Sequence, residues 1–343
     1  MTGPFGQEDQ RMKLNVSPSP HLRAPQDTRV IMRHMLIALV PACAVGVYRF
    51  GYQALMVLLI TTACAVLTEW TLHRLMKRES TVRDLSAAVT GLLLGMNLPA
   101  NAPWWLCALG AVFAIGLTKV LFGGLGNNFV NPALTARAFL MVSFPARMTN
   151  WAAPFNSLAA SAADAASSAT PLALIKQGGA AFALPGGTGA DLIRLLFGDR
   201  GGCVGEVSAL ALLIGFLWLL VFGVISARIP LVYVLAVFAG TALLGGAAGE
   251  GAYTPVVNGA VNALSGGLLL GAIFMATDPT TSPVTRAGQW IYALGCGLLT
   301  VVIRLFGGYP EGVSFSILIM NLFVPLIERG IRSRTFGEVK RRA

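Results

Sequence analysis

Thr90-Gly-Leu-Leu-Leu-Gly95 and Gly266-Gly-Leu-Leu-Leu-Gly271 are two copies of one short motif in a chain of 343 residues. The first copy is followed by a proline-containing turn and by an apolar segment that closes with Leu121-Phe-Gly-Gly124. The second is followed by the turn Met275-Ala-Thr-Asp-Pro279 and by an apolar segment that closes with Leu305-Phe-Gly-Gly308. The chain therefore contains an internal repeat, and this repeat organises the predicted fold.

Long apolar segments surround both copies. Hydrophobic residues make up 55% of the chain and charged residues 12%, with a mean hydropathy of +0.69, which excludes an ordinary soluble protein of this length. A helix needs about 20 apolar residues to cross a membrane, and continuous apolar runs exclude the alternating strands of a membrane barrel. We predict an all-α polytopic membrane protein with about ten transmembrane helices, at residues 31–50, 52–72, 84–99, 103–122, 128–145, 204–226, 229–249, 260–277, 287–306 and 313–328.

Because each half holds five predicted helices, the second copy of the repeat lies upside down relative to the first. Inverted repeats of this kind place functional sites near the midplane, where helices are broken. The predicted breaks are Gly126-Asn-Asn-Phe-Val-Asn-Pro132 and Asp278-Pro-Thr-Thr-Ser-Pro283. The resulting organisation is a cytoplasmic tail at 1–30, a first repeat at 31–145, a loop at 146–203, a second repeat at 204–328 and a basic cytoplasmic tail at 329–343.

Lys and Arg residues are distributed unequally over the two sides of this fold. With ten spans, the side that holds both termini collects 18 of the 25 Lys and Arg residues, the other side collects 6, and Arg137 lies inside a span. Positive residues accumulate on the cytoplasmic side, so we expect cytoplasmic termini and an extracytoplasmic loop at 146–203. The net charge of +10 then reflects basic loops beside lipid headgroups, and no binding motif indicates nucleic acid.

Polar residues within the predicted spans are candidate site residues. Three neighbouring amides, at Asn127, Asn128 and Asn131, need hydrogen-bond partners that lipid does not supply. We assign them, with Asp278, to a path for an ion or a second cofactor, and the alternative is a hydrogen-bond network between helices. Four acidic residues near span ends are interpreted as solvated: Glu69, Glu206, Asp278 and Glu311.

The loop at 146–203 contains the stretch Asp164-Ala-Ala-Ser-Ser-Ala-Thr170. Its composition fits a flexible tether, and its pattern also fits attachment of a flavin through a phosphoester bond to the last hydroxyl. A threonine hydroxyl is a poor nucleophile unaided, so attachment requires a separate flavin transferase with a metal ion. The candidate residues are Thr170 as the acceptor, Asp164 for recognition, Ala169 as the small preceding residue, and Ser167 and Ser168 as competing hydroxyls.

Other redox chemistry is not indicated within this chain. The five cysteines are scattered without paired spacing, and an iron–sulfur cluster needs four ligands. No glycine-rich nucleotide-binding motif follows a predicted strand. We therefore predict no catalytic residue and no metal site of its own.

Five landmarks carry a resemblance to a known family: Ser17-Pro-Ser-Pro-His21, Gly126 to Pro132, Asp164 to Thr170, Met275-Ala-Thr-Asp-Pro-Thr-Thr-Ser-Pro283, and Tyr309-Pro-Glu-Gly-Val313 followed by Asn321. With them the chain resembles the family that unites D subunits of the Rnf electron-transport complex with B subunits of the sodium-translocating NADH:quinone reductase. The landmarks cover nearly the whole chain. The short N-terminal tail favours the Rnf type.

The resemblance implies a specific function. It implies FMN esterified to Thr170 on the outer face, and a second, non-covalent flavin (riboflavin) among the helices. It also implies a multi-subunit redox complex in the bacterial inner membrane, maturation by a flavin transferase, and electron transport coupled to Na+ or H+ movement. Ser168 departs from the family, which commonly has glycine at that position, and this weakens the match around Thr170.

Two other functions stay open. One is the B subunit of a sodium-translocating NADH:quinone reductase, which would use a quinone as electron partner. The other is a cofactor-free solute channel of urea-transporter-like architecture, because fold alone does not decide function. The long loop with its acceptor threonine argues against a channel.

Overall fold

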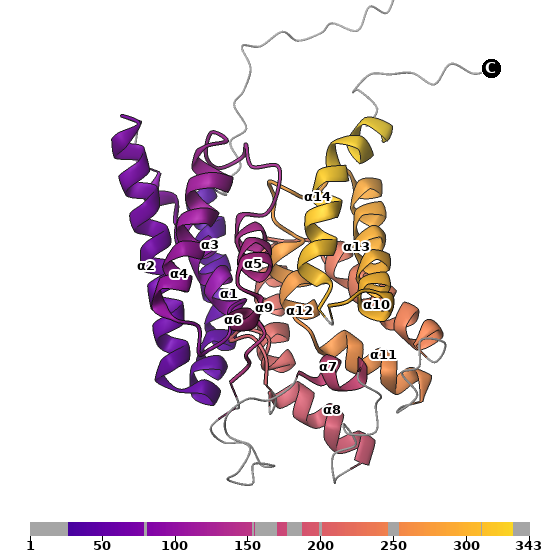
Figure 1. The fold of residues 1–343 in the computed structure, drawn as a ribbon. Coiled ribbons are helices and arrows are strands. Elements are labelled where there is room, and N and C mark those ends of the chain that lie inside the picture. The colour runs from indigo at the N-terminus through magenta and orange to yellow at the C-terminus, as the bar shows by residue number, and fades with distance from the viewer. Residues whose placement is uncertain are drawn as a thin grey trace, which may run out of the picture.

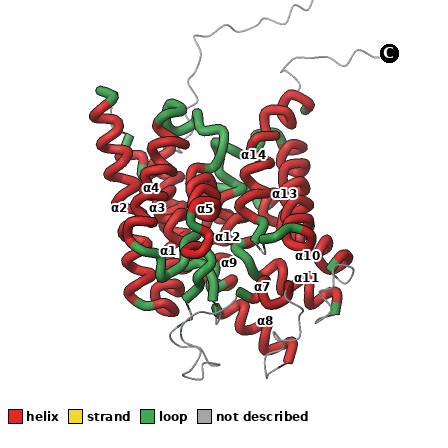
Figure 2. Tube along the Cα trace, viewed as in Figure 1, coloured by secondary structure: helices red, strands yellow, loops and turns green. Residues whose placement is uncertain are grey.

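The computed structural model describes residues 27–78, 81–152, 154, 170–176, 187–198, 201–245, 254–309 and 311–331. Within these ranges the regular structure is helical, apart from one isolated bridge between Pro99 and Cys203 (Figures 1 and 2). The predicted all-α class is therefore confirmed.

The first half begins with two long helices and continues with shorter ones. Its elements are α1 (Thr28–Phe50), α2 (Tyr52–Leu75), η1 (Val82–Asp84), α3 (Ser86–Met96), α4 (Trp104–Val112), which continues into the π-helix η2 (Phe113–Val120), α5 (Pro132–Ser143) and α6 (Pro145–Met148). The second half ends with two long helices. Its elements, with those of the connecting loop, are α7 (Pro171–Lys176), α8 (Gly187–Phe197), α9 (Ala209–Val221), α10 (Arg228–Leu244), α11 (Pro255–Leu264), α12 (Leu268–Leu270), the π-helix η3 (Gly271–Met275), α13 (Arg286–Phe306) and α14 (Val313–Gly330).

Helix length separates these elements into two groups. In the described residues, α1, α2, α13 and α14 are long and apolar enough to cross a membrane, and α11 with α12 and η3 forms a fifth candidate that is bent by 59°. The apolar helices α3, α4 with η2, α9 and α10 are shorter. Every predicted span contains helix, but ten full crossings stay a prediction.

The surface of α13 shows why these helices suit a membrane. Apolar residues at helical spacing, such as Leu294, Leu298 and Val302, are exposed. Thr300 on the opposite face is buried, and its hydroxyl lies 2.8 Å from the Tyr233 hydroxyl and 2.7 Å from the Ser316 hydroxyl. An apolar exterior around a hydrogen-bonded polar interior is the arrangement expected of helices surrounded by lipid. The chain is therefore a polytopic membrane protein.

Non-helical segments reach the interior, as Figure 2 shows. Both predicted breaks are confirmed, because residues 121–131 and 276–285 are not helical. A third break, at Ser265–Gly267 between α11 and α12, was not predicted. Gly266 and Gly267 both have φ of +67°, a conformation that side chains with a Cβ atom rarely adopt. The apolar sequence around them hides this break.

The described part of the loop at 146–203 contains helix, namely α7, α8 and most of α6. Leu195 of α8 packs against Val261 of α11. In Figure 1, α7 and α8 lie at the end of the molecule opposite to the C-terminal end of α14. The loop and the end of α14 are thus on opposite ends, as the ten-span topology requires.

Candidate functional site

Three of the four residues predicted to line an ion or cofactor path lie around one cavity. Asn128, Asn131 and Asp278 line a cavity of about 50 Å³ together with Ser86 and Lys119. The fourth residue, Asn127, is exposed, and its side chain donates to Gly123 O at 3.4 Å. The structure therefore separates Asn127 from the other predicted residues.

Hydrogen bonds across this cavity join the two predicted breaks. Asn128 Nδ2 donates to Thr280 Oγ1 at 3.0 Å, and Thr280 Oγ1 donates to Asp278 Oδ2 at 3.1 Å. Asn131 Oδ1 caps α5 by accepting from Ala133 N at 3.1 Å, and Asn131 Nδ2 donates to Met275 O at 3.3 Å. The hydrogen-bond network that we held as the alternative is present. It leaves Asn128 Oδ1 buried without a partner among the described residues.

A buried ion pair lies on the same cavity. Lys119 Nζ of η2 is 2.6 Å from Glu69 Oε1 of α2, and the two side chains are 2% and 0% exposed. Lys119 Nζ also donates to Ser86 Oγ at 2.7 Å, and Thr81 Oγ1 donates to Glu69 Oε1 at 2.8 Å. The prediction that Glu69 is solvated was wrong, because the helices enclose it and Lys119 balances its charge.

The size of the cavity bears on the expected riboflavin. A single water needs about 10–15 Å³ of such space, whereas pockets for small organic ligands measure about 300–1,000 Å³. A volume of about 50 Å³ admits water molecules or a small ion. A flavin ring does not fit between these side chains unless the helices separate.

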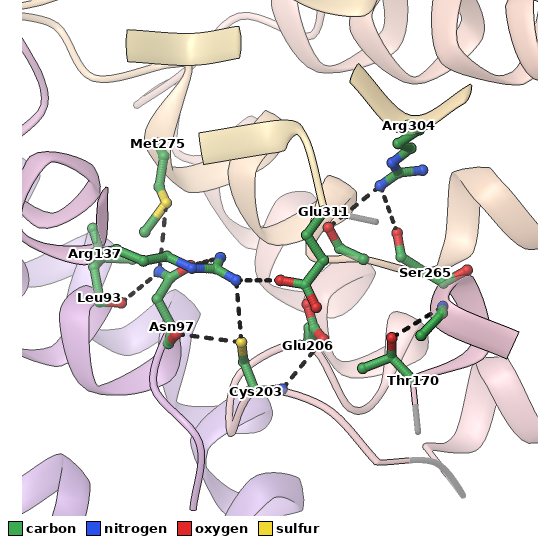
Figure 3. A network of polar contacts seen from close by, with 12 residues as sticks. Leu93, Asn97, Arg137, Thr170, Cys203, Glu206, Ser265, Met275, Arg304 and Glu311 are labelled. Carbon is green, nitrogen blue, oxygen red and sulfur yellow. Dashed lines mark hydrogen bonds and ion pairs between the residues drawn. The ribbon is translucent and has the colours of Figure 1, made fainter. Parts of the chain in front are cut away.

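Arg137 of α5 is the centre of a second buried polar cluster (Figure 3). Its guanidinium donates to Glu311 Oε2, to Asn97 Oδ1 at 2.8 Å and to Cys203 Sγ at 3.5 Å. Glu206 is buried, and its Oε1 accepts from Cys203 N at 3.2 Å. Arg137 lies in α5, within the predicted span 128–145, and is buried. The prediction that Glu206 and Glu311 are solvated was wrong.

The third break, Ser265–Gly267, is held by Arg304 of α13. Its guanidinium donates to Asn262 O at 2.6 Å, Ser265 O at 3.0 Å and Gly266 O at 3.3 Å. These carbonyls lie at the C-terminal end of α11, where helix carbonyls lack partners within the helix. Arg304 lies near the end of the predicted span 287–306 and is buried, where its guanidinium satisfies these carbonyls.

The substitution Gly267→Ala is expected to destabilise the protein. An added Cβ would lie 2.9 Å from Glu206 Oε2, and the left-handed conformation costs a residue with a Cβ roughly 1–2 kcal/mol. We expect a lower midpoint of thermal unfolding, which can be measured by tryptophan fluorescence of the protein in detergent. Gly124→Ala is the matched control, since Gly124 also has positive φ but a Cβ there meets nothing within 4 Å. Equal losses in both variants would mean that the contact with Glu206 is unimportant.

Thr170, the predicted acceptor, is the first described residue before α7. Its side chain is 3% exposed, and its Oγ1 accepts from Ala173 N at 3.3 Å. Leu172, two residues later, packs against Gly266, so the segment after Thr170 lies against the third break. Figure 3 shows Thr170 in the same view as the Arg137 cluster. Asp164, Ser167, Ser168 and Ala169 lie outside the described residues.

The hydrogen bonding of Thr170 is compatible with a phosphoester. Ester formation removes the hydroxyl proton and leaves the oxygen as an acceptor. The Thr170 hydroxyl donates no hydrogen bond to any residue that the structure describes, and its one contact uses the oxygen as acceptor. An ester at Oγ1 therefore sacrifices no hydrogen bond among these residues. Because the side chain is buried, attachment of a group at Oγ1 would require this segment to open.

Comparisons with known proteins agree with this architecture. The chain is 49% identical to the D subunit of the Na+-translocating ferredoxin:NAD+ oxidoreductase complex of Acetobacterium woodii, over 96% of this chain and 97% of the relative. It is 42% identical to the D subunit of the proton-translocating complex of Clostridium ljungdahlii, over 94% and 96%. It is 41% identical to the D subunit of the ion-translocating oxidoreductase complex of Stutzerimonas stutzeri, over 90% and 91%. The model of the NQR2, RnfD, RnfE family matches residues 15–337, and the chain therefore belongs to this family.

Proposed function

We propose that the chain is the D subunit of an ion-translocating ferredoxin:NAD+ oxidoreductase complex and that it carries FMN on Thr170. The observation that carries this proposal is the similarity to D subunits of such complexes over nearly the whole length of both chains. Partners are then the other subunits of the complex and a flavin transferase. The same relatives favour this function over a role in a quinone reductase and over a solute channel.

The residues of the chain would hold the flavin at one end of the helical body. Thr170 Oγ1 would form the phosphoester, and α7, packed against Gly266 through Leu172, would fix the attachment point. Bound FMN supplies electron transfer, while the protein supplies position and surroundings. A covalent link also keeps the flavin at high local concentration. In the proposed topology this end is extracytoplasmic, in the bacterial inner membrane.

The cavity at Asn128, Asn131 and Asp278 is the proposed ion path. Asn128 Oδ1 has no partner in the described structure, the Asp278 carboxylate is close by, and such oxygen atoms bind hard cations. The names of the relatives differ in the ion, Na+ in one and H+ in another, so the proposal covers both. A riboflavin among the helices stays a proposal. The cavity at Asn128, Asn131 and Asp278 is too small to hold it in the present structure.

Peptide mapping by mass spectrometry tests the proposal. The protein should be produced together with a flavin transferase, digested and analysed for the peptide that contains residue 170. We expect this peptide to carry the mass of FMN in phosphoester linkage, and the same peptide to be unmodified when the transferase is omitted. An unmodified peptide in material made with an active transferase would contradict the proposal.

A further inference from the structure

Glu311 has a buried carboxylate oxygen to which no residue in the described part of the chain donates a hydrogen bond. The residue lies in the short connection between α13 and α14, and its side chain is 8% exposed. Oε2 accepts from Arg137, whereas Oε1 is enclosed and finds no partner among the described residues. Burial of an unpaired polar atom is costly, and the cost is greater for an oxygen of a charged carboxylate. The structure therefore indicates a missing partner at Oε1.

A small cavity lies beside this carboxylate. It has a volume of about 10 Å³ and is lined by Arg137, Ala138, Met141, Glu311, Ser314 and Phe315. This is close to the space that one water molecule needs, about 10–15 Å³. Ser314, which has a hydroxyl group, is one of the lining residues. A single water here can relay a proton from solvent to Glu311, but the space excludes any larger ligand.

A second carboxylate, that of Glu206, lies close to the Arg137 guanidinium that pairs with Glu311. A Cβ built on Gly267 lies 2.9 Å from Glu206 Oε2 and 3.9 Å from Arg137 Nη1, so the Glu206 carboxylate and the Arg137 guanidinium flank the same glycine. Arg137 thus forms an ion pair with Glu311, and the Glu206 carboxylate lies near the same guanidinium. The other ionisable groups nearby are Arg304, which is hydrogen-bonded to carbonyls of the third break, and the Cys203 thiol, which contacts Arg137.

These surroundings favour a protonated Glu311. Burial, followed by the like charge of Glu206, raises the pKa of the Glu311 carboxyl above its ordinary value, and Arg137 and Arg304 act in the opposite direction. Protonation would remove one of two neighbouring negative charges. It would also turn Oε1 from an unpaired acceptor into a donor to a water molecule.

We propose that Glu311 is a reversible proton-binding site. The carboxylate takes a proton at Oε1 by relay through one water in the small cavity, with hydronium in solvent as the acid, and Oε2 stays hydrogen-bonded to Arg137. The water gives one proton to Oε1 and receives another from hydronium. One O–H bond forms on Glu311, one O–H bond of hydronium breaks, the relay water is restored, and no oxidation state changes. The proposal does not depend on the flavin at Thr170, and nothing in it specifies the ion that the complex moves.

Infrared difference spectroscopy of the whole complex in lipid nanodiscs tests this site. A pH titration should show the C=O stretch of a protonated carboxyl group that is lost as the pH rises and that is missing in Glu311→Gln. Glu328→Gln is the matched control, because Glu328 is a glutamate near the end of α14 whose carboxylate accepts from Val284 N at 2.9 Å. The control should retain the whole signal.

A second measurement keeps the proposal testable if Glu311→Gln fails to fold. This measurement is a pH titration by ¹³C NMR of wild-type protein labelled at the glutamate carboxyl carbons. Its spectrum should include one carboxyl resonance that titrates well above the ordinary glutamate pKa of about 4.3. A carboxyl signal that is unchanged in folded Glu311→Gln would overturn the proposal. So would a wild-type spectrum in which every glutamate titrates at its ordinary pKa. Neither readout involves flavin, so failure here is distinguishable from failure of the proposed function.

Discussion

Replacing Thr170 by alanine is expected to abolish covalent flavin attachment while leaving the helical fold intact. The variant lacks Oγ1, the atom that would form the ester. In the described structure it loses only the hydrogen bond with Ala173 N, and loss of such a cap costs about 0.5–2 kcal/mol. The measurement is flavin fluorescence of the denatured protein in a gel, together with the intact mass.

Three further variants identify the acceptor atom. Thr170→Ser keeps a hydroxyl and should retain part of the attachment. Ser167→Ala and Ser168→Ala remove the competing hydroxyls and should retain all of it. If Thr170→Ala carries flavin as the wild type does, the acceptor is another residue. If only Ser167→Ala or Ser168→Ala loses the flavin, that serine is the acceptor, and the assignment of the last hydroxyl of the Asp164–Thr170 stretch is wrong.

The substitution Lys119→Met is expected to cause the largest loss of stability. It leaves the Glu69 carboxylate fully buried without its cation, and removal of one member of a buried ion pair costs about 3–5 kcal/mol. The methionine nearly preserves the volume of the side chain, so the effect reports the charge. The expected result is a strongly lowered unfolding midpoint in detergent, with less protein in the membrane fraction.

A compensating variant separates charge from packing. The double variant Glu69→Gln, Lys119→Met removes both charges and should recover much of the stability, because no buried charge is left unpaired. Lys77→Met is the control for loss of an exposed lysine and should have almost no effect. A double variant that is as unstable as Lys119→Met would show that packing or the contact with Ser86 dominates.

The sequence was sufficient for the helical class. The three asparagines were predicted together because amides within an apolar segment need hydrogen-bond partners. The structure places Asn128 and Asn131 around one cavity with Asp278, whereas the turn of the chain leaves Asn127 exposed. The positions of the helices were predictable from apolar runs, but their lengths were not, because a hydropathy window does not distinguish a full span from a short helix that ends inside the protein.

The buried ion pairs could not be derived from spacing. Glu69 and Lys119 are 50 residues apart, and Arg137 and Glu311 are 174 apart, so no local pattern connects them. One signal was available: Lys119 lies in an otherwise apolar stretch, and a cation inside a membrane helix needs a carboxylate partner. The left-handed pair Gly266–Gly267 was hidden because glycine next to leucine is also common in uninterrupted helices that pack closely.

The hydrogen bond from Asn131 to Met275 O joins positions 144 residues apart, and this separation has a consequence for biosynthesis. When the ribosome has completed α5, the backbone that will complete this contact has not been made. The nascent first half must keep the polar groups around Asn131 hydrated or shielded by the insertion machinery until Met275 emerges. This part of the interior therefore cannot be completed until the second half of the chain has been synthesised as far as Met275.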